Sequence, residues 1–379
     1  MNRSMHGKPP TPIVFVWDNF GPTHIDRLEA VAASRDGPVV GVELNRTSAT
    51  YEWEGGQGTG FVWTTLPSRR PGHIALAFHL ARTIARVRPK AVFFCHYEMP
   101  AILVTAVVCR LCGVSAFVMN DSKFDDYTRQ FWRELLKRFF VVPYQAAIVA
   151  SPRSLDYYAF LGLDRSRIFP GYNAISISRI RAQSPAEPAP DGDHFAGRHF
   201  TIVARLVPKK NITLAIRAFA LARAAGLSRN LVVCGSGPLL ESLQTLCQDL
   251  GVAAAVEFRG FVQTAGVSAA LSSTLALVLP STEEQFGVVI AEAVALGVPV
   301  LASENCGARD TLVRSGVNGF VFEPDNADGL ARMMLMLDRD EALWRELSLN
   351  SARFAAAADT PIFVESVIAL ADRREHKNG

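Results

Sequence analysis

The hydrophobic positions of this chain alternate between two patterns. Short apolar runs without a helical stripe, such as 13–17 and 275–279, are typical of strands buried on both faces of a parallel sheet. Between such runs, apolar residues recur at helical spacing, as they do in 74–87 and 213–225. A repeated alternation of strand and helix predicts parallel sheets whose strands are joined by crossover helices.

The alternation occurs in both halves of the chain. Ser151 and Pro152 fit an N-cap followed by proline at the first helical position. The segment 45–72 predicts a loop with short strands, and 99–111 predicts a buried helix. The expected strands are 13–17, 91–95, 114–119, 146–150, 199–204, 231–234, 256–258, 275–279 and 299–302, and the expected helices are 74–87, 99–111, 129–142, 151–161, 213–225, 239–250 and 288–296.

The two halves are separated by the segment 184–198, which is dense in Pro, Gly and Asp and has no apolar stripe, so it is the natural linker. We therefore expect an α/β protein of two Rossmann-like, doubly wound domains that face each other across a cleft. The first domain is 1–183 and the second is 199–355. We expect 356–379 to form a C-terminal helix that packs back on the first domain.

The stretch 275–303 reads as strand, acidic loop, helix and strand. Pro280 ends the first strand, and Gly297 stands where a helix C-cap would be. This arrangement places Glu284 in the loop and Glu292 one turn inside the helix. Because ligands of open α/β sheets collect outside the carboxyl ends of the strands, both carboxylates would face a bound ligand.

A simpler interpretation of these glutamates is that an acidic residue near the start of a helix only favours the helix macrodipole. Phe286 and Gly287 lie between the two glutamates and leave an uncrowded backbone N–H at the helix start, beside a carboxylate. A carboxylate next to such a donor suits a polyhydroxylated anion.

Composition narrows the class of protein. Of the 379 residues, 49% are hydrophobic and no run of eighteen uncharged apolar residues occurs, which suits globular domains without a membrane span. The N-terminus has too short an apolar core for a signal peptide, so we expect a cytoplasmic protein. The six cysteines lack paired metal spacing, and Cys109 and Cys112 fall within an apolar helix, where buried thiols are the better interpretation than zinc ligands.

Charge is distributed unevenly along the chain. Residues 1–180 hold 21 Lys and Arg against 14 Asp and Glu, whereas 181–379 hold 18 against 22. A basic first half favours an anionic membrane surface or a phosphorylated acceptor. Nucleic acid is the competing partner, but the sequence has no zinc-finger, RNP or basic-arm signature, so we expect none.

The helix expected at 129–142 adds to this picture, because it mixes large apolar residues with Arg133, Lys137 and Arg138. It is either an interfacial amphipathic helix on an anionic membrane or a helix that faces the core and has a solvated basic side. The sequence favours neither alternative.

Polar candidates in the first half follow the predicted strands. His24 and Asp26 lie in the loop after 13–17 and could contact an acceptor or serve the loop and a helix cap. His96 comes directly after the strand 91–95 and is a ligand, a base or a structural histidine. Asn120 and Asp121 begin the loop after 114–119.

Cationic and glycine candidates lie in the second half. Arg205 follows the strand 199–204 and Lys210 lies five residues further on, before a helix. Taken alone, two solvated cations are the ordinary explanation. Gly235 and Gly237 form a turn between strand and helix, but the third glycine of a dinucleotide fingerprint is replaced by Leu240, which argues against an oxidoreductase.

Five segments together resemble one family. PSTEEQFGVVIAEAVALGVPVLAS, ARLVPKKNITLAIRAFA, CGSGP, FRGF and NCGARDTLVRSGVNGF are similar to the donor-domain motifs of retaining glycosyltransferases of the B fold type (GT-B), the family 4-like group 1 enzymes. Two glutamates separated by seven intervening residues, with Phe-Gly after the first, are the most specific feature, and this spacing selects Glu284 rather than Glu283. The resemblance covers 200–331 well and the first half loosely.

The resemblance implies a role for each matched residue. Arg205 and Lys210 would hold the diphosphate of a nucleotide-sugar donor, Glu284 would bind hydroxyls of its sugar, and Glu292 would hold the ribose hydroxyls. Catalytic roles fall to Glu284, Arg205 and Lys210. Donor contacts would come from Phe286, Gly287, Val288, Gly235, Gly237, Gly260 and Phe261, and weakly from Gly21, whereas His24, His96, Asn120 and Asp121 are acceptor-side candidates.

The implied activity is transfer of a sugar, with retention, to a glycan, a lipid-linked acceptor or a small molecule, as in bacterial polysaccharide or glycolipid synthesis. No metal or other cofactor is expected, because the cations and a helix start would meet the leaving phosphate and no clustered aspartate motif occurs. Several family members have a histidine near 120–122, and this chain has none there. Either Asp121 takes over its polar role or the acceptor is activated in another way, and the sequence does not distinguish the two. Alternatives are a nucleotide-sugar epimerase and a non-catalytic donor-binding subunit.

Overall fold

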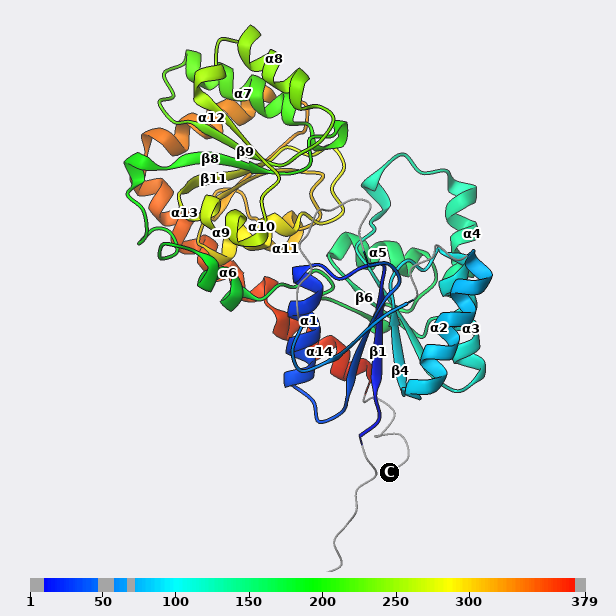
Figure 1. Ribbon diagram of the computed structural model, residues 1–379. Helices are drawn as coiled ribbons and strands as arrows, with labels where there is room; N and C mark the ends of the chain where they lie inside the picture. Colours follow the sequence, from blue (N-terminus) through cyan, green and yellow to red (C-terminus); the bar gives the residue numbers. More distant parts are fainter. Residues whose placement is uncertain (1–9, 47–57, 67–71, 372–379) are drawn as a thin grey trace, which may run out of the picture.

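The computed structural model describes residues 10–46, 58–66 and 72–371 and contains two α/β domains. Each domain is built on one sheet in which all the pairings are parallel. Figure 1 shows the two domains side by side, with helices on both faces of each sheet. The predicted fold class is confirmed.

The N-terminal domain has a seven-stranded sheet in the order β3-β2-β1-β4-β5-β6-β7. Helices α1 and α14 cover one face, and α2, α3 and α5 cover the other. Its strands are β1 (Ile13–Trp17), β2 (Val39–Glu43), β3 (Val62–Thr65), β4 (Ala91–Phe94), β5 (Ser115–Asn120), β6 (Ala146–Val149) and β7 (Ile168–Phe169), and its helices are α1 (Pro22–Ala33), α2 (His73–Val87), α3 (Pro100–Leu111), α4 (Phe131–Val141), α5 (Pro152–Phe160) and, returning from the chain's C-terminal end, α14 (Thr360–Ala371).

The C-terminal domain has a six-stranded sheet in the order β10-β9-β8-β11-β12-β13. Helices α9 and α10 pack on one face, and α7, α8 and α12 on the other. Its strands are β8 (His199–Val203), β9 (Leu231–Cys234), β10 (Val256–Gly260), β11 (Thr274–Leu279), β12 (Val300–Ser303) and β13 (Gly319–Phe322), and its helices are α7 (Ile212–Ala224), α8 (Leu240–Asp249), α9 (Thr264–Ser272), α10 (Val288–Ala295), α11 (Arg309–Leu312), α12 (Ala327–Arg339) and α13 (Glu341–Phe354).

The chain passes between the domains twice, and the two crossings are hydrogen-bonded to each other. The Ile175 N–H donates to the Ala358 carbonyl (2.9 Å), and the Thr360 N–H donates to the Ile175 carbonyl (3.1 Å). After the second crossing, α14 packs on α1, and its Phe363 ring lies 5.9 Å from that of Phe15. In Figure 1 this red helix lies beside blue α1 within the N-terminal domain.

The segment 184–198 lies on the C-terminal domain. The Ala189 N–H donates to the Leu296 carbonyl (2.8 Å), and the buried Arg198 guanidinium donates to the Ser272 and Thr274 carbonyls. Helix α6 (Ile177–Gln183), which precedes it, already packs on α9 and α10. The first crossing therefore occurs before residue 184, and the prolines and glycines of 184–198 serve tight turns against the second domain.

Several sequence expectations need revision at the level of elements. Strand β2 is absent from the predicted strands, and β3 lies within the segment expected to be a loop with short strands, of which 47–57 and 67–71 fall outside the described residues. The prediction of a buried helix at 99–111 is wrong, because α3 exposes four of its large apolar side chains. In the part of the chain that the structure describes, every helix is too short or too polar to cross a membrane.

Candidate functional site

A cleft of about 430 Å³ lies between the two domains. Its C-terminal wall comes from the loops after β8, β9 and β11 and from the start of α10. Strands β8 and β11 are neighbours in the sheet but not in the chain, because the order of strands reverses between them. Such a switch point leaves a crevice at the carboxyl ends of the strands, which is where open α/β sheets bind ligands.

Lys210 and Glu284 form an ion pair on this wall. Lys210 ends a short 3₁₀ turn (Pro208–Lys210) before α7, and Glu284 lies in the loop after β11. The Ser281 hydroxyl donates to the same carboxylate oxygen (3.1 Å), and the Lys209 carbonyl accepts from the Thr282 N–H (2.9 Å). The pair is thus held by two loops that are bonded together, and an ammonium and a carboxylate are presented side by side.

Two glycines let the loop after β9 lie against the loop after β8. A β-carbon on Gly235 would stand 1.8 Å from the Ala204 carbonyl oxygen, and one on Gly237 would stand 2.5 Å from that of Leu206. No other residue fits such close backbone contacts. Arg205 lies between these two contact points and lines the cleft.

The first turn of α10 also faces the cleft. Gly287 precedes the helix with φ of 94°, in the left-handed region, and a β-carbon there would press on the Leu279 side chain. Phe286, Gly287 and Val288 line the cleft. The unpaired N–H groups and positive dipole end of a helix start suit an anion.

Glu292 lies one turn further along α10, lines the cleft and is 8% exposed. Burial raises the pKa of its carboxyl to about 7, while the Arg179 guanidinium lowers it and the Asp26 carboxylate raises it. Arg179 of α6 is held by two 2.7 Å bonds to Asp26 of α1. Glu292 is therefore a carboxyl poised between protonation states at neutral pH, behind an ion pair that joins α6 to the N-terminal domain.

The N-terminal wall presents Asp121, which follows β5. Burial raises the pKa of its carboxyl, and the charge of Glu284 across the cleft acts in the same direction. Asn173 donates to the Asp121 carboxylate (3.1 Å). Beside them, the buried Arg27 guanidinium donates to the carbonyls of Thr23 and Tyr172. This wall is polar and faces Glu284.

His24 serves the start of α1. Its Nδ1 accepts the Gly21 N–H (3.0 Å), and its ring packs against Trp17, with the centroids 5.1 Å apart. Burial and the Arg27 charge hold its pKa well below the usual value, so the ring is neutral. The prediction that His24 and Asp26 lie in a loop is wrong, because both belong to α1. His24 has the capping role that was the alternative to an acceptor contact, and Asp26 pairs with Arg179.

The structure thus brings most of the predicted site residues to one cleft. Those that line it are His24, Asp121, Arg205, Lys210, Gly235, Phe261, Glu284, Phe286, Gly287, Val288 and Glu292. Five described residues among the candidates lie outside the lining: Gly21, His96, Asn120, Gly237 and Gly260.

These five residues shape loops around the cleft. Gly21 is the N-cap of α1, and Asn120 accepts the Ser122 N–H (2.6 Å) in the turn after β5. The Gly260 carbonyl accepts the Gly235 N–H (2.7 Å). His96 is exposed and left-handed (φ 56°) at the end of β4.

The sequence did not point to Arg27, Tyr172 and Asn173, which line the cleft, or to Arg179, which pairs with Asp26 near Glu292. Tyr172 and Asn173 follow β7, and a glycine followed by polar residues after a strand was the signal available for them. Arg27 lies one helical turn after His24, on the same side of α1. No local sequence pattern indicated the role of Arg179, because its partner Asp26 is 153 residues away in the chain.

Contacts across the cleft hold the two domains together. The Gln285 amide donates to the Ser122 hydroxyl (3.1 Å). Arg153, in the first turn of α5, donates to the Asp310 carboxylate (2.7 Å) and to the Cys306 carbonyl (2.6 Å). Within the described residues, no group of three or more His, Cys, Asp or Glu side chains is placed to hold a metal ion.

Comparison with known proteins agrees with this geometry. Residues 196–353 match the family model described as Glycosyl transferases group 1. An exopolysaccharide phosphotransferase of Streptomyces coelicolor is 33% identical over 184 residues, 47% of this chain and 19% of that protein. A GDP-mannose-dependent alpha-(1-6)-phosphatidylinositol monomannoside mannosyltransferase of Mycobacterium tuberculosis is 35% identical over 158 residues, 39% of this chain and 41% of that protein. The matched segments are thus less than half of these relatives.

Solved structures match the whole fold. HepE of Anabaena, in complex with UDP and glucose, superposes with a TM-score of 0.74 at 17% identity, covering 96% of this chain and 100% of that one. Sucrose-phosphate synthase of Thermosynechococcus elongatus gives 0.71 at 17% identity, covering 97% and 100%.

The protein is therefore a two-domain α/β protein with the GT-B fold and a cleft at the switch point of its second sheet. The predicted resemblance to the group 1 glycosyltransferases is confirmed by the family match of its C-terminal domain.

Proposed function

We propose that this protein is a retaining, metal-independent glycosyltransferase that moves a sugar from a nucleotide diphosphate to a hydroxyl acceptor. The observation that carries the proposal is the shared wall of Arg205, Lys210, Glu284 and the start of α10. Cations and helix N–H groups suit a diphosphate, and a carboxylate suits sugar hydroxyls. The cations and the Glu284 carboxylate lie next to each other on this wall, just as the diphosphate and the sugar are adjacent in such a donor.

The chemistry follows from where charge develops. Transfer breaks the bond between the anomeric carbon and the phosphate oxygen, and the departing diphosphate gains negative charge. Arg205, Lys210 and the α10 start would stabilise that charge, and preorganised donors of this kind contribute roughly 3 kcal/mol each. Glu284, paired with Lys210, would hold the sugar, and Glu292 would bind the ribose hydroxyls. Positive charge supplied by the chain itself supports a reaction that needs no metal.

The acceptor would enter from the N-terminal wall. Asp121 lies there, close enough to Glu284 to feel its charge, and would take the place of the histidine that several family members carry. We place the acceptor hydroxyl near the Asp121 carboxyl. The excess of Lys and Arg in residues 1–180 supports a glycan or lipid-linked acceptor at an anionic membrane surface, as for a peripheral protein on the inner face of the plasma membrane.

A donor screen tests the proposal first. One relative is a GDP-mannose-dependent mannosyltransferase, and HepE is solved in complex with UDP. We would therefore compare UDP-, GDP- and ADP-sugars by thermal shift. A donor at 100 times its dissociation constant stabilises the folded state by about 2.7 kcal/mol. A chain that none of these nucleotides stabilises would lack the proposed activity.

Two substitutions test the site once a donor is known. Glu284→Ala and Arg205→Ala should each cut transfer by at least about tenfold, since a lost charged contact costs roughly 1.5 to 3 kcal/mol. Lys209→Ala is the matched control, because Lys209 is exposed and takes part in the site through its carbonyl. Wild-type rates for Glu284→Ala would remove this residue from the site.

A further inference from the structure

Helix α4 exposes most of its large apolar side chains and buries a charged one. Its large apolar residues Phe131, Trp132, Leu136 and Phe139, with Val142 after it, are 58% to 76% exposed. They recur at helical spacing and form one stripe. The residues of α4 that are buried are Glu134 and Val141. A helix of a soluble domain normally buries such a stripe, so α4 presents to its surroundings what other helices hide.

Charged groups fix this orientation. Glu134 pairs with Arg129 (3.2 Å) and accepts the Tyr157 hydroxyl (2.5 Å). Lys137 pairs with Glu134 (3.3 Å) and with Glu98 (3.0 Å), just before α3. The polar side of α4 is thus bound to α5 and to the start of α3. To bury the apolar stripe in the domain, the helix would have to break this network.

The neighbouring helices extend the apolar surface. Helix α3 exposes Val104, Val107, Val108 and Leu111 at a helical spacing, and α2, which packs on α3, exposes Ile74 and Phe78. Figure 1 shows α2, α3 and α4 together on the side of the N-terminal domain away from α1 and α14. We call the exposed apolar side chains of α2, α3, α4 and Val142 the α2–α4 face. Exposed apolar side chains gathered on one side of a domain mark an interaction site.

The charge of these helices indicates the partner. Helices α2, α3 and α4 hold six Lys and Arg and a single acidic residue, Glu134, which is buried. Exposed Arg133 and Arg138 flank the α4 stripe, in which Trp132 is the most exposed aromatic residue. Aromatic and aliphatic side chains beside cations suit the interface of an anionic bilayer, because the rings and aliphatic groups enter the acyl boundary while the cations meet the headgroup phosphates.

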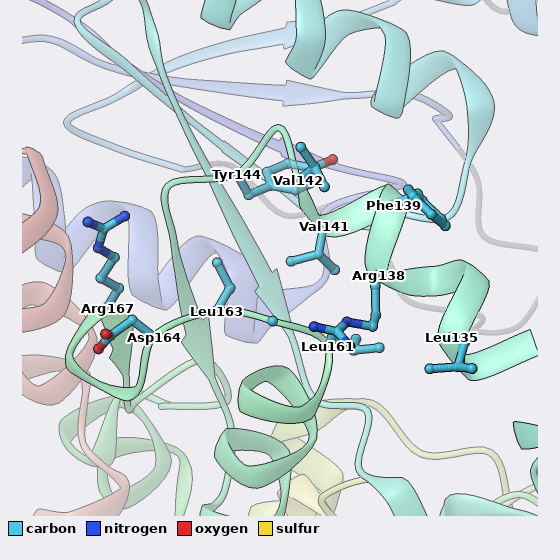
Figure 2. Close-up of a pocket in the computed structure, with 11 residues that line it drawn as sticks. Leu135, Arg138, Phe139, Val141, Val142, Tyr144, Leu161, Leu163, Asp164 and Arg167 are labelled. Carbon is cyan, nitrogen blue, oxygen red and sulfur yellow. The ribbon is translucent and has the colours of Figure 1, made fainter.

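A groove of about 830 Å³ beside α4 supports the same partner. It lies between α4 with the following turn and the segment 161–167, and its walls are largely apolar. Figure 2 shows the Arg138 side chain extending from α4 toward Leu161, with Leu163 at the centre of the groove. An apolar channel next to a guanidinium fits the acyl chain and phosphate of one lipid.

We propose that the α2–α4 face docks on a bilayer of anionic phospholipid, with α4 lying in the interface. The inference extends the proposed function, because docking would bring the cleft to a membrane-borne acceptor. A short loop links the two, since Phe131 begins α4 ten positions after Asp121. Docking itself does not depend on transfer.

Vesicle sedimentation tests the proposal. The full chain should bind phosphatidylcholine vesicles that contain phosphatidylglycerol, and bind pure phosphatidylcholine weakly. Trp132→Ser with Phe139→Ser should weaken binding at least about tenfold, since two aromatic rings no longer enter the bilayer. Arg133→Ala with Arg138→Ala should remove most of the preference for the anionic vesicles. The emission of Trp132 should shift to the blue on binding, and Trp132→Phe should lack that change.

Leu221→Ser with Leu349→Ser is the matched control, because both leucines are exposed on helices of the C-terminal domain, and it should bind like the wild type. Circular dichroism verifies the fold of each variant. Absence of binding to anionic vesicles, or equal binding by the Trp132 and Phe139 variant, overturns the proposal. So does a dimer in light scattering that this variant dissociates, which would assign the face to a second copy. Loss of sugar transfer with intact vesicle binding would overturn only the proposed function.

Discussion

At the scale of single residues, Asp121 and Glu284 define the two sides of the cleft. Both are carboxyl groups, but they meet different surroundings: Glu284 is paired with Lys210, whereas the half-buried Asp121 accepts a hydrogen bond from the Asn173 amide. Burial raises the pKa of Asp121, so its affinity for a proton is strengthened where an acceptor hydroxyl would lie. The two carboxyl groups therefore suit different partners.

Replacement of Asp121 should separate acceptor chemistry from donor binding. We expect Asp121→Ala to lower transfer at least about tenfold, since a hydrogen bond to a charged group contributes roughly 1.5 to 3 kcal/mol. Thermal stabilisation by the donor should change little. Asp156→Ala, which removes an exposed carboxylate on α5 of the same domain, is the control for the donor response. If the donor no longer raises the melting temperature of Asp121→Ala, this residue belongs to the donor site instead.

Glu292 makes stability depend on pH. Its pKa rises from 4.5 to about 7 on folding, so between these values the folded protein holds a proton that the unfolded chain has released. The free energy of unfolding should therefore fall as the pH rises from 4.5 to 7, by up to about 3 kcal/mol from this group. Urea unfolding of Glu292→Gln should lack this part of the decline, and exposed Glu346→Gln should retain it. Identical slopes in all three proteins would contradict the assignment.

At the scale of elements, the loops of the C-terminal domain are packed backbone against backbone. A β-carbon on Gly307 would stand 1.9 Å from the Gln285 carbonyl oxygen, so the loop after β12 lies directly on the loop that carries Glu284. The Gly307 N–H donates to the Glu284 carbonyl (3.2 Å), and the Ala308 N–H donates to that of Phe286 (2.8 Å). These contacts hold the loop of Glu284 and Phe286 in place on the C-terminal wall of the cleft.

Gly307→Ala should therefore disturb both stability and the site. We expect the free energy of unfolding to fall by about 3 kcal/mol or more, because the two loops must move apart. The donor should give a smaller thermal shift than in the wild type. Gly197→Ala is the matched control, since a β-carbon there meets nothing within 4 Å. Equal stability of the two variants would show that the loops separate at little cost.

The elements also show which features the sequence could predict. From β8 to β12, the strands and the helices α7, α8 and α10 were predictable because their signals are local: apolar runs, a proline after β11 and a glycine after α10. Helix α9, strand β13 and the helices α11 to α13 were not among the predicted elements. Strand β2 was missed because Gly41 interrupts its apolar run, and the structure shows that this glycine makes room for Phe20 and Leu28. The exposed stripe of α3 was missed because no local pattern tells which apolar face lacks a partner within the chain.

The site residues that belong to local motifs were predictable, and those that act through distant partners were not. Arg205, Lys210, Glu284 and Glu292 belong to segments with recognisable spacing, and all four line the cleft. Asn173 and Arg179 act through partners 52 and 153 residues away, so only the packing of the two domains brings them into place.

At the scale of the whole molecule, the cleft depends on how the two domains are held. The paired crossings at Ile175 and Thr360 form a hinge on one side, and Asp26 and Arg179 tie α1 to α6 beside it. Across the cleft, Arg153 reaches from α5 to the α11 region. We expect the domains to rotate about these crossings and Arg153 to limit how far they separate.

Arg153→Ala should open the molecule. Arg153 bonds the Asp310 carboxylate and the Cys306 carbonyl of the opposite domain, and its remaining guanidinium nitrogen bonds Asp125 of its own domain (2.5 Å). Because hydrogen bonds to charged groups contribute roughly 1.5 to 3 kcal/mol each, their loss should shift the population toward separated domains. The radius of gyration from small-angle X-ray scattering should increase, and the donor should restore part of the closure.

The matched control is Arg165→Ala, which removes an exposed ion pair with Asp156 inside the N-terminal domain and should leave the radius of gyration unchanged. Transfer by Arg153→Ala should fall mainly through a higher KM for the acceptor, because Asp121 and Glu284 then approach each other less often. If the radius of gyration and the acceptor KM of Arg153→Ala both match those of the control, the contacts of Arg153 do not hold the cleft closed. The hinge and the Asp26–Arg179 pair would then be sufficient to set the distance between the two walls.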